Sequence, residues 1–263
     1  MGSSEIQGKL WGAGAKDFVE FNESTFEVLW KAMLDAAKVG MDTRILDAGC
    51  GGGGASILAA GLGAKVTGLD ASEAFINIVR QRVPNGEFRV GDIEELPYEY
   101  NSFDVSFSSQ TLMFADNPSM AIHEMKRVTK PNGRLVVGIW GAPEDCDLER
   151  LGKALRDNLP KEVLTKLPKS TTFSLSGHGL LEKLMEQVGL KILDSEGLNH
   201  RFEYTDFELC WQGLKATGPM QGAMHFVGEE RLKVAFQKAI ESLWDGKGAI
   251  RLKNRVRYVL AAS

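Results

Sequence analysis

The sequence has few cysteines, no long apolar run and little net charge, and each of these absences excludes a class of protein. The three cysteines stand far apart among 263 residues, so neither a disulfide framework nor a CxxC metal site is expected. No apolar stretch approaches the ~18 residues of a membrane-spanning helix. The first residues, MGSSEIQGKLWG, lack the charged-then-apolar pattern of a signal peptide. We therefore expect a cytoplasmic chain without a metal site or a membrane partner.

The charge balance also argues against a nucleic-acid partner. Lys and Arg number 31 and Asp and Glu 35, a net charge of −4, so no basic field would attract a phosphate backbone. Hydrophobic residues at 43% and charged residues at 25% are ordinary for a folded protein and exclude a disordered chain. Glycine is unusually frequent, with 29 copies, and several of these glycines cluster in one short segment.

Short apolar strands alternate with helices over the first half of the chain. The strands are expected at 43–47, 64–70, 87–90, 103–108 and 134–140. This alternation predicts βαβ units with right-handed crossovers and a parallel sheet covered by helices. Capping boxes are expected at the starts of two helices, at Ser24–Glu27 and at Thr205–Glu208, and Ser72 is expected to cap another.

Beyond residue 141 the alternation loosens. Residues 142–175 and 205–245 read mostly as helices and are interpreted as insertions that form a lid. No linker or repeat divides the chain, so we expect one domain over residues 1–263.

A glycine-rich turn between a strand and a helix is the clearest motif. Gly49-x-Gly51-x-x-Gly54, with Asp70 following about 20 positions later, fits a dinucleotide-binding fingerprint and an NAD(P)-dependent oxidoreductase. Asp47 argues against that interpretation, because a carboxylate at the strand end would repel a pyrophosphate. S-adenosylmethionine carries a sulfonium and an ammonium group and no phosphate, so it favours an acidic residue at this position.

Five ordered segments carry a family resemblance. They are 45–53, 66–72, 91–98, 102–105 and 130–135, beginning with ILDAGCGGG. Together they resemble class I S-adenosylmethionine-dependent methyltransferases of the small-molecule branch, methyltransferase type 11, which includes ubiquinone- and menaquinone-biosynthesis-type enzymes. Residues 11–15 and 251–255 also resemble one bacterial subgroup of that branch.

The resemblance implies a Rossmann-like α/β fold with a mostly parallel seven-stranded sheet, helices on both faces and an antiparallel last strand near 252–260. It also implies methyl transfer from S-adenosylmethionine to an oxygen, nitrogen, carbon or sulfur atom of a small-molecule acceptor. Two alternatives stay open at this point: the NAD(P)-dependent oxidoreductase and a non-catalytic partner protein with this fold. The motifs do not bear on the oligomeric state.

The resemblance also assigns cofactor-binding residues. Gly49 and Gly51 would let the backbone approach the methionine part of the cofactor, with Asp47 near its ammonium group. Asp70, at the end of the second strand, would accept from both ribose hydroxyls.

Five further positions complete this predicted site. Ala71 would lie beside the adenine, Asp92 would accept from its amino group, and Ile93 would pack on the ring. Ser109 and Gln110 follow the fourth strand, where the methyl-bearing sulfur and the acceptor would meet.

No catalytic dyad is evident, and the acceptor pocket is assigned to added segments. Trp11, Phe18 and Phe21, together with the insertion at 205–226, are expected to form a roof over the cofactor. His225 in that insertion is a candidate for a catalytic or acceptor-binding role. The competing interpretations are a histidine without chemical function, and aromatic residues that only pack the insertion onto the sheet.

Overall fold

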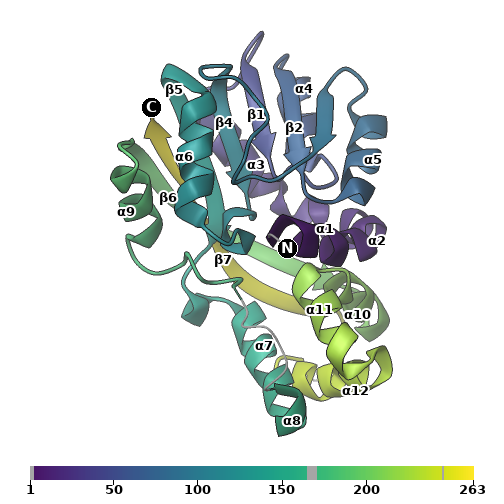
Figure 1. Cartoon of the computed structure of the whole chain (residues 1–263). Coiled ribbons are helices and arrows are strands. Elements are labelled where there is room, and N and C mark those ends of the chain that lie inside the picture. Colours follow the sequence, from purple (N-terminus) through teal and green to yellow (C-terminus); the bar gives the residue numbers. More distant parts are fainter. Residues whose placement is uncertain (1–2, 165–170, 245) are drawn as a thin grey trace.

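A seven-stranded sheet organises the computed structural model, which describes residues 3–164, 171–244 and 246–263 (Figure 1). Its strand order is β3-β2-β1-β4-β5-β7-β6. The strands are β1 (Arg44–Ala48), β2 (Lys65–Asp70), β3 (Glu87–Val90), β4 (Phe103–Ser109), β5 (Thr129–Trp140), β6 (Lys191–Tyr204) and β7 (Ile250–Ala262). β1 to β5 pair in parallel, and β7 runs antiparallel to both of its neighbours. The predicted mostly parallel sheet with an antiparallel last strand is confirmed.

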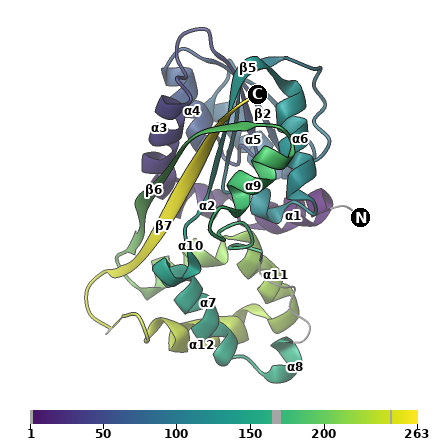
Figure 2. The ribbon, with the colours of Figure 1, turned by 90° about the vertical axis from the view of Figure 1, so that its left-hand side faces the viewer.

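The central strands are apolar on both faces because helices cover both sides of the sheet. Ile45, Leu46 and Phe107 are no more than 1% exposed. Figure 2 views the sheet nearly edge-on. The helices α3 (Glu27–Ala36) and α4 (Gly54–Gly61) lie on one side of it, and α6 (Pro118–Val128) and α9 (Leu180–Gln187) lie on the other. α5 (Glu73–Arg82) links β2 to β3 and packs against both strands.

Parallel strands bring their carboxyl ends to one edge of the sheet. β1, β2 and β4 end at Ala48, Asp70 and Ser109, and β1 is hydrogen-bonded to both of the others. The glycine turn after β1 and the side chains at the ends of β2 and β4 are therefore close neighbours, at the edge where open α/β sheets bind ligands.

Most of the remaining helices lie beyond this carboxyl edge, in the lower part of Figure 1. They are α1 (Ser3–Ala13), α2 (Ala15–Phe21), α7 (Asp147–Asp157), α8 (Lys161–Leu164), α10 (Phe207–Lys215), α11 (Gly218–Val227) and α12 (Glu229–Ile240). α1 packs against α11, and α2 packs against α10. Residues 165–170 and 245, which belong to the two expected insertions, lie outside the described residues.

Two of the three predicted helix caps are wrong. Residues Glu23–Phe26 form a short 3-10 helix, η1, and the Thr25 hydroxyl donates to the Asn22 carbonyl at 2.6 Å. α3 therefore begins at Glu27 without a side-chain cap. α10 is capped by Asp206, whose carboxylate accepts from the Leu209 amide at 3.0 Å, because an ionised acceptor makes the stronger bond.

The Ser72 cap is confirmed. Its hydroxyl accepts from the Phe75 amide at 3.3 Å.

Candidate functional site

The turn after β1 adopts a conformation that glycine alone adopts readily. Gly49, Gly51 and Gly53 have φ angles of +85°, +51° and +91°. A Cβ on Gly49 would lie 2.2 Å from Thr111 Oγ1, whereas a Cβ on Gly51 would meet no described atom within 4 Å. Gly51 thus faces open space, and a ligand can approach the backbone there without meeting a side chain.

The end of β2 is tied to this turn through Asp70. Its carboxylate accepts from the Gly51 amide at 2.9 Å and from the Ser72 amide at 2.8 Å. Burial raises the pKa of the Asp70 carboxyl, and the two amides oppose that rise. The amide that a bound anion would use is already paired with a carboxylate.

A second carboxylate, from η1, occupies the start of α4. Glu23 is 5% exposed, accepts from the Gly54 amide at 3.2 Å and forms an ion pair with Arg82 at 2.6 Å. Burial raises the pKa of Glu23, while Arg82 opposes this rise. Sequence reasoning missed this residue, because Glu23 stands in an ordinary polar stretch and reaches the turn only through the tertiary fold.

Asp47 is the third carboxylate at the turn. It is 3% exposed and accepts from the Ser56 hydroxyl at 2.7 Å. Burial raises the pKa of Asp47 to about 7, and the charges of Asp70 and Glu23 add to the rise. Three carboxylates around one turn, with Asp47 and Glu23 buried and Asp70 half-buried, favour a cationic ligand and disfavour a phosphate.

The corner after β4 contains an unpaired amide side chain. Ser109 accepts from the Trp30 indole N–H at 3.1 Å. Gln110 has a φ of +57°, and its backbone N–H donates to the Gly138 carbonyl at 2.8 Å. Both polar atoms of the Gln110 side chain are buried without a partner among the described residues. Because buried polar groups are nearly always hydrogen-bonded, this amide is available to a ligand.

The remaining predicted cofactor residues adjoin Asp70. The Gly91 amide donates to the Asp70 carbonyl at 3.0 Å, which brings Asp92 and Ile93 beside the end of β2. The Asp92 carboxylate accepts from the Glu94 amide at 2.9 Å, the local contact that an Asp side chain makes two residues along in a turn.

Helix α1 lies directly over the turn after β2. A Cβ on Gly8 would be 2.3 Å from the Ala71 carbonyl oxygen, and one on Gly12 would be 2.9 Å from Ser72 Oγ. The first helix therefore covers the predicted adenine side of the site.

Aromatic residues of the N-terminal segment pack helix α1 against α11 of the insertion. Trp11 packs edge-on against Phe18 at 5.4 Å and Phe114 at 5.3 Å. A Cβ on Gly218 would lie 2.5 Å from the Trp11 indole nitrogen, so α11 fits closely over that ring. Phe21 is half-buried against the core.

The structure does not bring His225 into this cluster. It is exposed in the last turn of α11, with its ring edge-on to Phe226 at 5.2 Å. The other predicted site residues gather at the carboxyl edge of the sheet.

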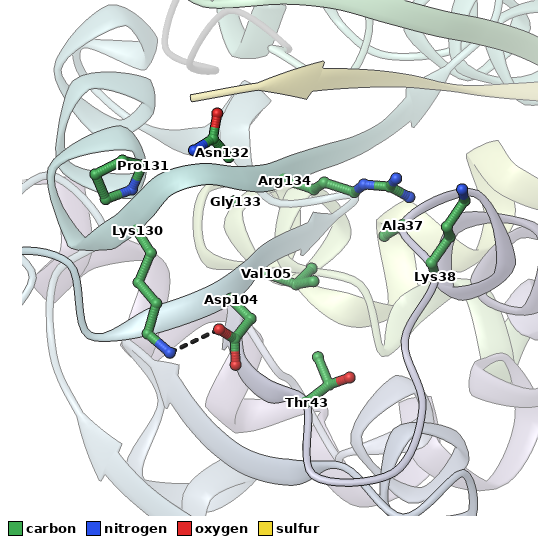
Figure 3. Close-up of a pocket in the computed structure, with 10 residues that line it drawn as sticks. All are labelled: Ala37, Lys38, Thr43, Asp104, Val105, Lys130, Pro131, Asn132, Gly133 and Arg134. Atoms are coloured by element: carbon green, nitrogen blue, oxygen red, sulfur yellow. Dashed lines mark hydrogen bonds and ion pairs between the residues drawn. The ribbon is translucent and has the colours of Figure 1, made fainter.

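A shallow cavity of about 250 Å³ opens at the opposite edge of the sheet, near the starts of β1, β4 and β5 (Figure 3). Its lining includes Thr43, Arg134 and the ion pair of Asp104 with Lys130, at 2.6 Å. It contains none of the predicted site residues and is separate from the glycine turn.

Comparison with known proteins agrees with this geometry. The chain is 36% identical over 198 residues to a malonyl-[acyl-carrier protein] O-methyltransferase of Erwinia pyrifoliae, over 68% of this chain and 76% of the relative. The chain belongs to the methyltransferase family. Residues 46–137 match the family described as methyltransferase domain, which confirms the resemblance found in the sequence motifs.

Other relatives match over a shorter length. A demethylmenaquinone methyltransferase of Paenarthrobacter aurescens is 36% identical over 113 residues, which are 43% of this chain and 45% of that protein. The matched region thus spans about half the length of such a relative. The YcgJ protein of Bacillus subtilis shares the fold, with a TM-score of 0.60, 17% identity and coverage of 89% of this chain and 97% of that one.

Among residues 3–164, 171–244 and 246–263, no helix is long and apolar enough to cross a membrane. In the same ranges, no group of three or more His, Cys, Asp or Glu side chains is arranged to hold a metal ion.

Proposed function

We propose that this protein, acting as one domain, transfers a methyl group from S-adenosylmethionine to a small-molecule acceptor. One observation carries the proposal: Asp47, Asp70 and Glu23 surround the glycine turn. S-adenosylmethionine presents a sulfonium and an ammonium group, and a negatively charged site attracts both.

The same observation argues against a dinucleotide. A pyrophosphate needs the free amides of the turn and of the following helix. Here Asp70 is paired with the Gly51 amide and Glu23 with the Gly54 amide, at 2.9 and 3.2 Å. A phosphate would displace carboxylates from these amides and then face them at close range, so the NAD(P) alternative is disfavoured.

The residues present suit S-adenosylmethionine part by part. Asp47 would face the ammonium group, and the Gly49–Gly51 backbone would follow the methionine chain. Asp70 would accept from the ribose hydroxyls, because a carboxylate offers about four lone-pair sites and two amides use only two of them.

The adenine would lie under α1. Ala71 supplies a small side chain beside it, Ile93 a nearly buried apolar face at 9% exposure, and Asp92 an acceptor for the amino group. Gly8 allows α1 to approach this position closely enough to exclude water.

The chemistry demands little from acid–base groups, because the sulfonium is already an activated methyl donor. Rate acceleration would come from holding sulfur, methyl and acceptor atom in line in a dry site. The unpaired Gln110 amide would help to orient the reactants. A site complete in these respects disfavours the non-catalytic alternative.

The acceptor would lie beneath the N-terminal aromatic residues and the insertion, which pack on each other as one cover. The relatives are named for methylation of demethylmenaquinone and of malonyl-[acyl-carrier protein]. We infer an acceptor of small-molecule size, free or carried on a larger partner, and no nucleic-acid partner.

The test is release of S-adenosylhomocysteine by the full chain, with a panel of phenol, amine, thiol and carboxylate acceptors. We expect acceptor-dependent release that Asp70→Asn reduces at least tenfold. Acceptor-independent background release across the whole panel, together with tight binding of NADH, would contradict the proposal.

A further inference from the structure

A buried histidine on β6 has a ring nitrogen that is unpaired among the described residues. His200, on β6, is 5% exposed. Its ring stacks on Phe26 at 4.6 Å and meets Trp140 and Phe202 edge-on at 5.2 and 4.7 Å. Burial lowers the pKa of His200 to about 4, so the ring is neutral near pH 7.

The hydrogen bonds around His200 define its tautomer. Its Nε2 atom lies 3.1 Å from the Thr25 hydroxyl oxygen. The single Thr25 hydroxyl proton is directed to the Asn22 carbonyl, at 2.6 Å. Thr25 therefore accepts from Nε2–H, and Nδ1 carries a lone pair. Nδ1 is buried and has no partner in the described part of the chain.

The buried polar side chains around Thr25 are hydrogen-bonded, in contrast to the Nδ1 atom of His200. Asn22 is fully buried, donates to the Gly213 carbonyl at 2.6 Å and accepts from the Tyr204 hydroxyl at 2.7 Å. This network fixes the N-terminal segment against β6 and α10. A buried acceptor left unpaired costs free energy, so its presence inside an otherwise paired network points to a ligand.

Two routes of contact connect His200 to the corner after β4. Ser109 pairs with Gly138 on β5, and Trp140 follows two residues later with its ring against His200. On the other route, Trp30 donates to Ser109 and lies 6.1 Å from Phe26, which stacks on His200.

Trp30, Phe26 and Trp140 thus form a continuous series of side-chain contacts between the corner after β4 and His200. The unpaired amide of Gln110 marks one end and the unpaired Nδ1 the other.

We propose that His200 selects methyl acceptors that carry a hydroxyl or N–H group on an apolar ring, by accepting their hydrogen bond at Nδ1. The proposal rests on the proposed methyl transfer and adds the substrate class. A hydroxyl or N–H pairs with the lone pair, whereas a carboxylate brings only further lone pairs to it. A site built around one buried polar atom discriminates strongly against ligands that leave the atom unpaired.

The experiment compares phenol with benzoate, which share a ring and differ in the donor. Both are titrated calorimetrically into the full chain saturated with S-adenosylhomocysteine. The wild-type protein should bind phenol roughly tenfold more tightly than benzoate. His200→Gln can still reach Thr25 with its amide but has no acceptor at the Nδ1 position, so phenol affinity should fall roughly tenfold.

A second variant separates the ligand contact from a structural effect. His200→Asn retains a polar acceptor near Nδ1 and loses the Thr25 contact, so it should bind phenol more tightly than His200→Gln does. The ¹⁵N signal of Nδ1 should also shift upfield when phenol binds. Equal binding of phenol and benzoate, no phenol binding by the wild type, or wild-type phenol affinity in His200→Gln would overturn the proposal.

Titration of S-adenosylmethionine into the same samples keeps the two proposals apart. Failure of phenol discrimination with intact S-adenosylmethionine binding overturns the role of His200 alone. Absence of S-adenosylmethionine binding by the wild type overturns the proposed function.

Discussion

The Gly51 amide donates a 2.9 Å hydrogen bond to the Asp70 carboxylate, joining the turn after β1 to the end of β2. This bond occupies an amide donor that a phosphate would otherwise use. It also holds the negative charge of the Asp70 carboxylate beside the turn. Asp70 therefore shapes the site before any ligand binds, in addition to its proposed role toward the ribose.

Asp70→Asn should weaken S-adenosylmethionine binding at least tenfold, because charge-assisted hydrogen bonds contribute about 1.5–3 kcal/mol each. The asparagine oxygen still accepts from one amide, so the unliganded protein should lose little thermal stability. Calorimetric titration measures the affinity. Asp104→Asn is the matched control, because that carboxylate also accepts a backbone amide, from Arg44 at 2.9 Å, but at the opposite edge of the sheet. Equal loss of affinity in both variants would contradict the assignment.

Asp47 should make the unliganded protein less stable as pH rises. Its pKa is raised from 3.8 to about 7 by burial, so between these values the folded state holds a proton that the unfolded chain releases. The free energy of unfolding should therefore fall from about pH 4 to pH 7 and then level off. Asp47→Asn should lack this pH dependence. Its free energy of unfolding should therefore rise relative to that of the wild type by a few kcal/mol between about pH 4 and pH 7. Urea unfolding at a series of pH values measures the difference, and parallel curves would show that Asp47 titrates normally.

The same carboxyl should couple cofactor binding to proton release. A cation beside Asp47 favours its ionised form and so lowers its raised pKa. S-adenosylmethionine affinity should then increase between about pH 6 and pH 8, with release of a proton near neutrality. Titrations in buffers of different ionisation enthalpy count that proton. A pH-independent affinity in Asp47→Asn is the expected control, and the same proton release in that variant would assign the effect to another group.

Gly8→Ala should disturb the cover over the site. The added Cβ would lie 2.3 Å from the Ala71 carbonyl oxygen, so α1 must move away from the turn. We expect weaker S-adenosylmethionine binding and a lower melting temperature, although alanine alone favours a helix by about 1 kcal/mol. Gly61→Ala in α4 is the control: it meets nothing within 4 Å and should gain stability without a change in affinity. If Gly8→Ala behaved like the control, α1 would not cover the cofactor site.

Sequence reasoning placed the predicted cofactor residues at one edge of the sheet because they end short apolar strands. Asp47, Asp70 and Ser109 each lie at such an end, and the carboxyl ends of parallel strands meet at one edge. Nothing in the local pattern could reveal Glu23 or His200. Glu23 reaches the turn from a 3-10 helix, and the surroundings of His200 exist only after β6, β7 and β5 pair.

The wrong cap prediction at Ser24 has a similar origin. The Ser24 capping box has suitable spacing, but these residues form a 3-10 helix instead. In it, the Thr25 hydroxyl is hydrogen-bonded to the Asn22 carbonyl and to the His200 ring. The prediction for His225 rests on its place in the insertion, and the structure leaves this side chain exposed in α11, apart from the residues at the glycine turn.

The most direct test of the proposed function is parallel calorimetric titration of the unliganded full chain with S-adenosylmethionine and with NADH. Three carboxylates around the glycine turn predict saturable one-to-one binding of S-adenosylmethionine and no detectable binding of NADH. Saturable binding of NADH without binding of S-adenosylmethionine would contradict the account.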